Sequence, residues 1–182
     1  SNVGISKVIY KNYIKKPQDF IDRLHSFGLN NQLGLQITGE NKPRIKNTDE
    51  KDWSANSLPW MSIGYEVRLT PLQVLSFYNT VANGGKSMKP IFVKKVVRRG
   101  EVIEEFKPSV IKSSICSDST IAQARRLLEG VVEQGTATNL KNANYRIAGK
   151  TGTAQIARGA GGYKNSSDSN AFAGVTYQAS FV

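Results

Sequence analysis

The 182-residue chain has very little cysteine or histidine, with one of each, Cys116 and His25. A single cysteine excludes an internal disulfide, and with one histidine the chain offers no Cys or His cluster for a metal ion. His25 lies beside the apolar stripe of an expected helix, where a histidine is more often structural. We therefore expect no metal site and no cofactor, and we expect any activated nucleophile to use a base other than histidine.

Long apolar runs are also missing. No stretch of 18 apolar residues occurs, and the first residues do not read as a signal peptide, so these residues predict no membrane span. A membrane anchor elsewhere in a longer parent protein is compatible with this pattern. The length of 182 residues and the 39% hydrophobic content predict one domain with one core.

Acidic residues are scarce relative to basic ones, 14 against 25, which gives a formal net charge of +11. Such an excess favours an anionic partner, and one hypothesis is a non-catalytic module that binds an anionic polymer. The basic residues are scattered, however. The densest cluster, Lys94, Lys95, Arg98 and Arg99, surrounds an expected turn, so a solvated basic surface is the simpler interpretation.

Four segments have the spacing and the end signals of helices. Residues 5–13 and 20–27 carry apolar residues at helical spacing, and the second segment has Pro17 in its first turn and Gly28 at its end. Thr70 and Pro71 predict the start of a third helix that stops at residues 83–85. A fourth is expected from Ser117 or Asp118 to Gly135.

The remaining segments favour loops and strands, so the pattern predicts an α+β fold. Residues 29–59 read as loop with short elements. Residues 91–106 predict a hairpin that turns at Arg99-Gly100. Residues 145–157 predict a strand, residues 158–170 a flexible loop, and residues 171–182 the start of a further strand.

The segment AGKTGTAQ, residues 148–155, contains Gly-Lys-Thr and therefore raises the question of a phosphate-binding loop. That loop needs a glycine five positions before Gly149, and Asn144 stands there. The motif should also open a helix, whereas Gly152 and β-favouring residues follow. The sequence therefore excludes the phosphate-binding loop.

The alternative interpretation is a strand that forms one wall of an active site. A glycine in a strand often marks close approach of a ligand, and an ammonium beside a hydroxyl group suits a substrate carboxylate. A free backbone N–H just past the glycine is able to stabilise an oxyanion. The tetrapeptide Lys150–Thr153 has these features, although a strand that merely contains lysine, threonine and glycine is common.

The flanking segments give this tetrapeptide its context. LLEGVVEQGTAT, YRIAGKTGTAQ, the upstream IGYEVRLTPLQVLSFYNTVANGGKSMKP and the opening SNVGISKVI together resemble the transpeptidase domain of class B, division-type penicillin-binding proteins. The resemblance covers essentially the whole chain. It implies a single partial domain over residues 1–182, truncated at both ends. Its fold would be that shared with serine β-lactamases, mostly the helical subdomain, with residues 91–106 as a hairpin insertion and residues 145–182 as part of the antiparallel sheet.

The resemblance also implies roles for individual residues. Lys150 matches the lysine of the family's third motif, which maintains the positive field and helps proton transfer at the nucleophile. Thr151 and Thr153 match hydroxyls that bind the terminal carboxylate of the substrate, and Gly152 keeps the wall flat. The backbone N–H of Thr153 matches one oxyanion donor. Asn2 matches the asparagine of Ser-x-Asn, and the alternative for it is an ordinary helix-terminal residue.

The family's nucleophilic serine precedes Ser-x-Asn, so we expect it before residue 1 and expect these 182 residues to be inactive alone. The Ser-x-x-Lys match at Ser109–Lys112 is rejected because its stretch has no helical stripe and no Ser-x-Asn follows it before Lys150. The Ser-x-Asn match at Ser54–Asn56 precedes Ser109 and lies in a loop-like stretch, so it is rejected too.

The resemblance implies that the parent protein is a serine-type peptidoglycan D,D-transpeptidase. It would cross-link stem peptides ending in D-Ala-D-Ala, bind β-lactams and work with division proteins, without nucleic acid. It would lie in the bacterial cell envelope, at the periplasmic face of the inner membrane. A penicillin-recognising sensor, a β-lactamase relative and the basic polymer-binding module remain the alternatives.

Overall fold

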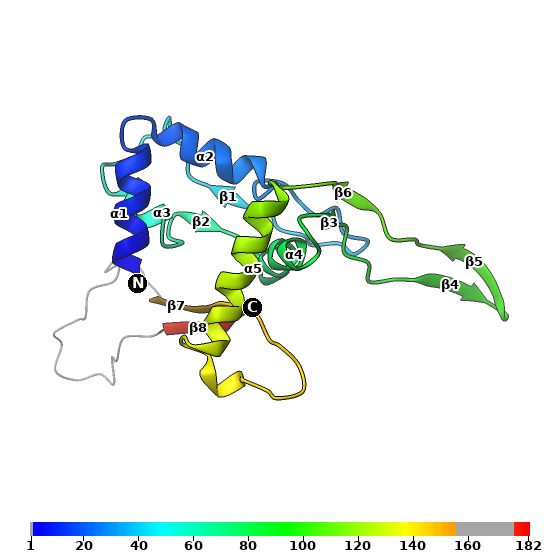
Figure 1. The fold of residues 1–182 in the computed structure, drawn as a ribbon. Helices are drawn as coiled ribbons and strands as arrows, with labels where there is room; N and C mark the ends of the chain where they lie inside the picture. The colour runs from blue at the N-terminus through cyan, green and yellow to red at the C-terminus, as the bar shows by residue number, and fades with distance from the viewer. Residues whose placement is uncertain (1, 156–176) are drawn as a thin grey trace, which may run out of the picture. The chain divides into compact units, whose positions relative to one another are not determined.

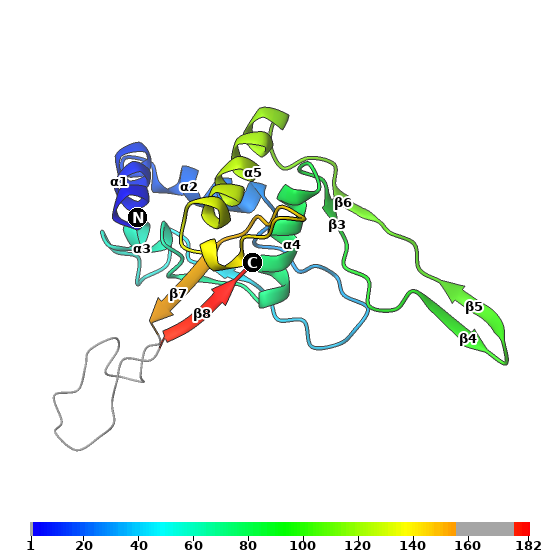
Figure 2. The ribbon, with the colours of Figure 1, turned by 60° about the horizontal axis from the view of Figure 1, so that its bottom comes forward.

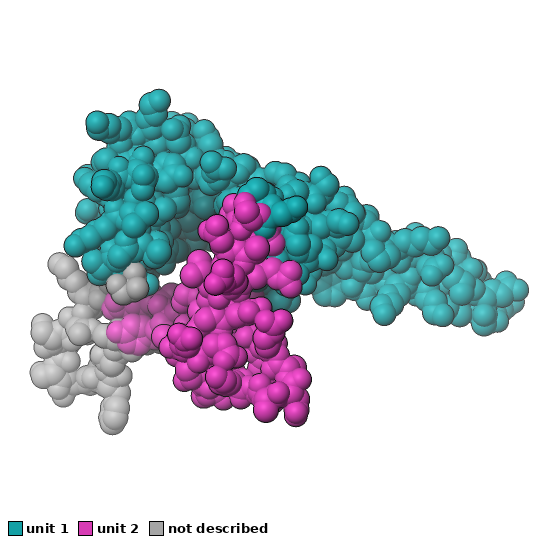
Figure 3. Space-filling view, in the orientation of Figure 1, with its two compact units in different colours: residues 1–118 teal, residues 119–182 magenta. Residues whose placement is uncertain are grey.

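The computed structural model describes residues 2–155 and 177–182, and the chain forms two compact units. The first unit is Ser1–Asp118 and the second is Ser119–Val182 (Figure 3). The flexible loop expected at residues 158–170 lies outside the described residues, as do 156–157 and 171–176. The single partial domain expected for residues 1–182 stays a prediction.

The first unit contains the first three helices that the sequence predicts (Figure 1). They are α1 (Asn2–Tyr13), α2 (Pro17–Ser26) and α4 (Pro71–Ala82). A short helix, α3 (Ser57–Met61), overlaps the end of residues 29–59, where the sequence predicts loop with short elements. Helix α4 begins with a capping box. Its Gln73 backbone N–H donates to Thr70 Oγ1 at 3.2 Å, and the Thr70 N–H donates to Gln73 Oε1 at 2.8 Å. These two bonds satisfy donors that a helix N-terminus otherwise leaves open.

The strands of the first unit form three antiparallel pairs. Strand β1 (Arg44–Ile45) pairs with β2 (Val67–Arg68), β3 (Ser87–Met88) with β6 (Val110–Lys112), and β4 (Lys95–Arg98) with β5 (Glu101–Glu105). The sequence predicts only the last pair. The other strands have two or three residues each, which is too short for an alternating pattern to appear.

The hairpin of β4 and β5 is confirmed, within narrower limits than residues 91–106. Arg99 has φ +51° and Gly100 has φ +87°, so both turn residues are in the left-handed region that a type I′ turn requires. Every residue of both strands is exposed, and the hairpin extends away from the helices of its own unit (Figure 1). The basic cluster Lys94, Lys95, Arg98 and Arg99 therefore lies in solvent, as the simpler interpretation expects.

The core of the first unit is a small apolar cluster. Ile21, Ile45 and Met61 are its buried members, and they come from α2, β1 and α3. Helix α1 contributes no buried residue, and its Val3, at 63% exposure, faces solvent. The apolar spacing of residues 5–13 therefore predicts the helix correctly, but it does not mark a core face among the described residues.

A buried lysine joins β1 to β2 beside this core. Lys46 is 6% exposed, and its ammonium lies 3.0 Å from Glu66 Oε1 and 3.1 Å from Asp52 Oδ2. Burial lowers the pKa of Lys46, but the hydrogen bonds and charges of Glu66 and Asp52 outweigh burial and raise it overall. The hydrogen bond from Lys46 lowers the pKa of Asp52. The Lys46 ammonium and the Asp52 carboxylate therefore stabilise each other's charged forms.

The second unit contains the fourth expected helix and the strand pair that carries the motif (Figure 2). Helix α5 (Asp118–Glu133) starts at the last residue of the first unit, and a 3₁₀ turn, η1 (Thr138–Leu140), follows it. Strand β7 (Thr151–Gln155) pairs with β8 (Tyr177–Phe181) in antiparallel fashion. The described part of this strand begins at Thr151, later than the expected start at Tyr145. In the described part of the chain, no helix is long and apolar enough to cross a bilayer.

We predict that Asp52→Asn reduces the acid sensitivity of the fold. The folded-state pKa of Asp52 is lowered, so its charge stabilises the folded state above the unfolded pKa, and this stabilisation is lost as the pH falls through the folded pKa. The free energy of unfolding, measured in urea between neutral pH and about pH 3, should therefore fall less steeply in this variant than in the wild type. Asp49→Asn makes the same charge change outside the cluster. Equal pH profiles for wild type and Asp52→Asn would contradict the prediction.

Candidate active site

The motif strand β7 is held in one register by β8. Thr151 lies opposite Phe181, Gly152 opposite Ser180, and Thr153 opposite Ala179. Just before β7, Lys150 and Val182 exchange both backbone hydrogen bonds, at 2.8 Å and 3.2 Å. This reciprocal exchange identifies them as a hydrogen-bonded pair of the antiparallel ladder.

The type of this first pair determines which way each N–H of β7 points. Hydrogen-bonded and non-hydrogen-bonded pairs alternate along an antiparallel ladder. Thr151 and Thr153 therefore occupy non-hydrogen-bonded pairs, and their N–H groups point away from β8. In the described part of the chain, β8 is the one strand that pairs with β7. The Thr153 N–H is thus directed at an open strand edge, where an oxyanion donor has to be.

The side chains of the motif are accessible. Thr151 and Thr153 lie on the same face of β7 because they are two residues apart, and the Thr153 side chain is exposed. Lys150 is also exposed, and its ammonium donates to the Thr151 carbonyl at 2.7 Å and lies 3.5 Å from Thr151 Oγ1. The ammonium and the hydroxyl of the neighbouring residue are therefore already close together.

The acidic residues of the second unit leave Lys150 without a counter-charge. Its described residues include two carboxylates, Glu129 and Glu133, and each pairs with another cation. Glu133 lies 2.7 Å from Lys141 Nζ, and Glu129 lies 3.5 Å from Arg146 Nη1. In this part of the chain, the Lys150 ammonium bonds only to neutral oxygens and is available for an anion.

The structure adds Thr136 to the motif. Its Oγ1 lies 2.8 Å from Thr151 Oγ1, and either hydroxyl is able to donate. Thr136 follows α5, and the Gly149 N–H bonds to the Leu128 carbonyl of the same helix at 3.2 Å. Sequence reasoning did not assign Thr136 to the site, although it lies within the quoted segment EQGTAT. Assigning it requires the contact between Thr136 and Thr151, which are 15 positions apart in the sequence.

Two glycines give the strand pair its close fit. A Cβ at Gly149 would lie 2.3 Å from the Phe181 ring and 2.5 Å from the Val182 carbonyl, closer than folded proteins tolerate. A Cβ at Gly152 would meet the hydroxyl of Ser180 at 2.5 Å, and that small side chain is able to turn aside. Gly149 is therefore required by backbone packing, whereas Gly152 is required less strictly by the described residues.

The remaining candidates belong to the first unit. Asn2 is the first residue of α1 and is exposed. Ser109 precedes β6, and its carbonyl accepts the Lys89 N–H at 2.9 Å, so it is not at a helix N-terminus. Ser54 and Asn56 lie in the turn before α3. Lys150–Thr153 thus lie on or next to one strand of the second unit, whereas Asn2 and both rejected matches belong to the first unit.

Comparison with known protein families decides which class of protein this strand belongs to. A family model described as the penicillin binding protein transpeptidase domain matches residues 1–180. The chain belongs to this transpeptidase family. The resemblance seen in the sequence is therefore confirmed, and the mixed helical and antiparallel fold agrees with it.

Curated relatives of this transpeptidase chain come from several bacteria. It is 32% identical over 168 residues to penicillin-binding protein PbpB of Mycobacterium tuberculosis, covering 87% of this chain and 24% of the relative. It is 32% identical over 167 residues to the peptidoglycan D,D-transpeptidase FtsI of Buchnera aphidicola, covering 91% of this chain and 27% of the relative. The chain thus spans about a quarter of the length of the curated relatives it matches.

Solved transpeptidase structures have the same fold. Penicillin-binding protein 3 of Mycobacterium tuberculosis in complex with aztreonam matches with a TM-score of 0.73 and 30% identity, over 89% of this chain and 36% of that chain. The transpeptidase domain of Burkholderia pseudomallei penicillin-binding protein 3 matches with a TM-score of 0.72 and 26% identity, over 100% of this chain and 48% of that chain. The similarity therefore extends over nearly the whole chain.

We predict that Gly149→Ala destabilises the second unit. The added methyl group would overlap the Phe181 ring and the Val182 carbonyl, so the free energy of unfolding should fall by about 1–3 kcal/mol. Gly130→Ala, in α5, is the matched control. Its Cβ would meet nothing within 4 Å, and alanine is favoured over glycine in a helix by about 1 kcal/mol. Urea denaturation of both variants checks the pair, and equal stability would contradict the geometry described for Gly149.

Proposed function

We propose that this chain is part of a peptidoglycan D,D-transpeptidase in which β7 is the substrate-binding wall. The observation that carries the proposal is the register of β7, which directs the Thr153 N–H toward a strand edge that no other described strand covers. The Lys150 ammonium bonds to the Thr151 carbonyl and has no counter-charge among the described residues. Family membership supports the same reaction, since the Buchnera aphidicola relative is itself named a peptidoglycan D,D-transpeptidase.

In the proposed reaction, a serine oxygen attacks the carbonyl carbon between the two D-alanines of a stem peptide. The carbonyl oxygen becomes an oxyanion, and the Thr153 N–H donates a hydrogen bond to it. When the tetrahedral intermediate collapses, the C–N bond breaks, the terminal D-alanine leaves with a proton, and an acyl-enzyme remains. An acceptor amine then attacks the ester, forms the cross-link and releases the serine.

The side chains of the wall bind the leaving D-alanine in this proposal. Its carboxylate carries one negative charge, which suits the Lys150 ammonium and the hydroxyls of Thr151 and Thr153. The hydrogen bond between Thr136 and Thr151 fixes the orientation of one of these hydroxyls. Lys150 also maintains a positive potential that favours proton transfer from the serine, and Gly152 leaves room for the substrate backbone.

The serine itself comes from another part of the polypeptide in this proposal. Ser109, the one Ser-x-x-Lys serine in the sequence, precedes a strand and not a helix. Asn2, at the start of α1, is proposed to bond to the catalytic lysine and a substrate amide, as the family motif implies.

The setting of the enzyme is proposed by analogy with its relatives. Penicillin-binding protein 3 of Mycobacterium tuberculosis has been solved with aztreonam and with ampicillin, and we propose that β-lactams bind to the same wall here. We also propose that the parent protein acts in the cell envelope, at the periplasmic face of the inner membrane, together with division proteins.

We predict that the isolated 182-residue chain is not acylated by a fluorescent penicillin. Ser109 lacks the helical setting that places a lysine one turn after the nucleophile. Gel fluorescence after incubation checks this, with a complete transpeptidase domain of a relative as the positive control. Labelling that disappears in Ser109→Ala would overturn the assignment of the nucleophile.

In the parent protein, we predict that Lys150→Ala slows acylation by fluorescent penicillin by about 10²-fold or more, the loss typical for a group that stabilises charge in the transition state. Lys141→Ala is the matched control, because Lys141 belongs to the same unit and already pairs with Glu133. Stopped-time labelling measures both rates. Equal acylation rates for Lys150→Ala and the unmodified parent would contradict the proposed role of β7.

A further inference from the structure

The hairpin of β4 and β5 has a strand edge that the proposed reaction does not use. In the described part of the chain, β4 pairs with β5 alone, and every residue of both strands is exposed. Both ribbon views show the hairpin extending away from the helices of its own unit (Figure 1, Figure 2). An exposed strand edge presents backbone N–H and C=O groups with which another strand is able to pair.

The register of the hairpin determines which groups of β4 point to this edge. The Lys94 carbonyl accepts the Phe106 N–H at 2.8 Å, and the next residues, Lys95 and Glu105, lie opposite each other. Lys94 and Phe106 therefore occupy a hydrogen-bonded position, and the alternation of the ladder makes Lys95 and Glu105 a non-hydrogen-bonded pair. The N–H and C=O of Lys95 thus point away from β5.

Val97 has the same orientation as Lys95. The register shifts between Val96 and Val97, and the residue left without a partner, Ile103, belongs to β5. The alternation along β4 therefore continues through Val97, whose N–H and C=O also point away from β5. Among the described residues, no loop or side chain bonds to the outward backbone groups of Lys95 or Val97.

The chain just before β4 already binds an amide group. Gln36 Oε1 accepts the Val93 N–H at 3.0 Å, and Gln36 Nε2 donates to the Val93 carbonyl at 3.2 Å. One amide thus satisfies both backbone groups of one residue, as a paired strand does. Lys95 and Val97 offer the same combination of a donor and an acceptor to a peptide backbone.

The side chains of this edge indicate the charge of a strand that would pair with it. Lys94, Lys95 and Arg98 are basic, and Val96 and Val97 are apolar and β-branched. None of the three basic side chains forms an ion pair in the part of the chain that the structure describes. Directly opposite side chains of an antiparallel pair interact, and opposite charges favour pairing whereas like charges oppose it. An added antiparallel strand should therefore carry acidic residues opposite the cations and β-branched residues opposite the valines.

Strand β5 shows that such a complement pairs with β4. Its sequence is EVIEE, and it places Glu101 opposite Arg98 and Glu105 opposite Lys95. The inner edge of β4 thus already has acidic and apolar partners. For a strand without a bulge, the corresponding complement of residues 94–98 is EVVEE.

We propose that the free edge of β4 binds an extended acidic segment of a partner protein, which adds a third, antiparallel strand to the hairpin. The segment has two β-branched residues between acidic ones, as in EVVEE, and its backbone pairs with Lys95 and Val97. Lysine on an edge strand disfavours neutral and basic strands, so the edge selects an acidic one. A second copy of this chain suits the edge less well, because β5 of one copy on β4 of another is a head-to-tail contact that does not close.

The peptides EVVEE and KVVKK, both acetylated and amidated at their ends, test the sign of the charge. Each is titrated in millimolar concentrations into the ¹⁵N-labelled 182-residue chain, and the dissociation constant is taken from the NMR shifts of the Lys95 and Val97 backbone amides. EVVEE should shift both amides and bind at least about tenfold more tightly than KVVKK, since attractive cross-strand pairs replace repulsive ones. Equal affinities, or EVVEE shifts confined to other residues, would overturn the proposal.

Two N-methylated forms of EVVEE separate strand pairing from charge attraction. In the antiparallel register, the second and fourth residues of the peptide lie opposite Val97 and Lys95, so methylation there removes the N–H groups that face β4. Methylation of the third and fifth residues changes N–H groups that point away from β4. The first form should bind about tenfold more weakly than EVVEE, because it loses two hydrogen bonds, and the second form should keep its affinity. Equal affinities of the two forms would show charge attraction alone and would overturn the proposal.

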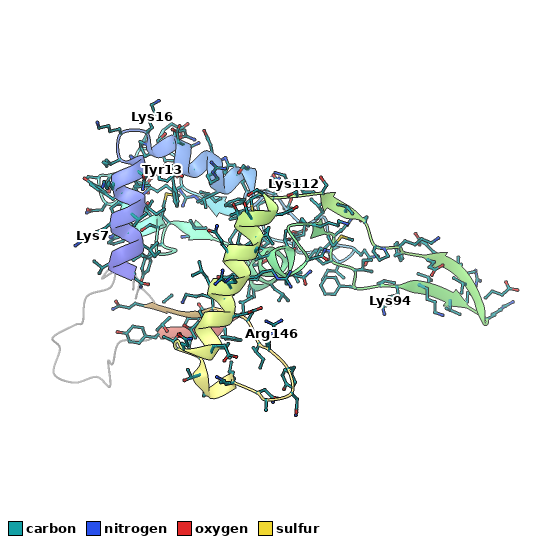
Figure 4. All side chains as sticks on the ribbon, viewed as in Figure 1. Lys7, Tyr13, Lys16, Lys94, Lys112 and Arg146 are labelled. Carbon is teal, nitrogen blue, oxygen red and sulfur yellow. The ribbon has the colours of Figure 1, made fainter. Side chains whose placement is uncertain are left out.

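Two substitutions compare this edge with the general positive charge of the chain. Lys94 lies on the hairpin and Lys7 on α1, and both are exposed (Figure 4). Lys94→Gln should weaken EVVEE binding about two- to fivefold, the effect of an exposed ion pair, whereas Lys7→Gln should leave it unchanged. Equal weakening by both substitutions would contradict a site on β4.

Dilution of the chain without peptide tests a second copy as the occupant. The Lys95 and Val97 amide shifts should stay constant between about 50 μM and about 1 mM protein, and sedimentation should show no self-association in this range. Shifts of these two amides that follow self-association would assign the edge to a second copy and overturn the proposal of a partner protein.

Discussion

The paired backbone bonds between Lys150 and Val182 determine what the motif strand is able to do. If Val182 formed this hydrogen-bonded pair with Thr151 instead of Lys150, Thr153 would also occupy a hydrogen-bonded pair. Its N–H would then donate to β8. The same shift would move both threonine side chains to the other face of the strand. Gly149 permits the observed register, because no Cβ stands between it and the Phe181 ring. The lack of a side chain at Gly149 therefore permits the register that directs the Thr153 N–H to the open edge.

Charge is distributed so that the motif lysine stays available. The chain has 25 basic and 14 acidic residues, and in the described part of the second unit Glu129 and Glu133 pair with Arg146 and Lys141. The net positive charge therefore need not indicate nucleic acid or another polymer. It includes one ammonium held beside a hydroxyl of the motif strand, and a basic hairpin whose charges are solvated.

Much of this fold follows from local signals in the sequence. The helix that Thr70 caps is confirmed, and it was predictable because its capping box lies within four consecutive residues. The Arg99-Gly100 turn is also confirmed, because the positive φ angles that it requires belong to two adjacent residues. The short pairs β1–β2 and β3–β6 were missed because they depend on partners 20 or more positions away. The motif in the sequence predicted Lys150–Thr153 as a group. The contact with Thr136 was not predictable, because it depends on how the chain returns from α5 to β7.

Glu66 shows how two requirements meet at one position. Its φ of +59° is in the left-handed region, where a residue other than glycine is disfavoured by about 1–2 kcal/mol. Its carbonyl accepts the Lys46 N–H at 3.1 Å, and its carboxylate accepts the buried Lys46 ammonium. A glycine would remove the backbone strain and leave the ammonium with one partner fewer, whereas most other residues would keep the strain and still lack the carboxylate. Positions 46 and 66 are therefore expected to change together in the course of evolution, with glycine at 66 accompanied by an uncharged residue at 46.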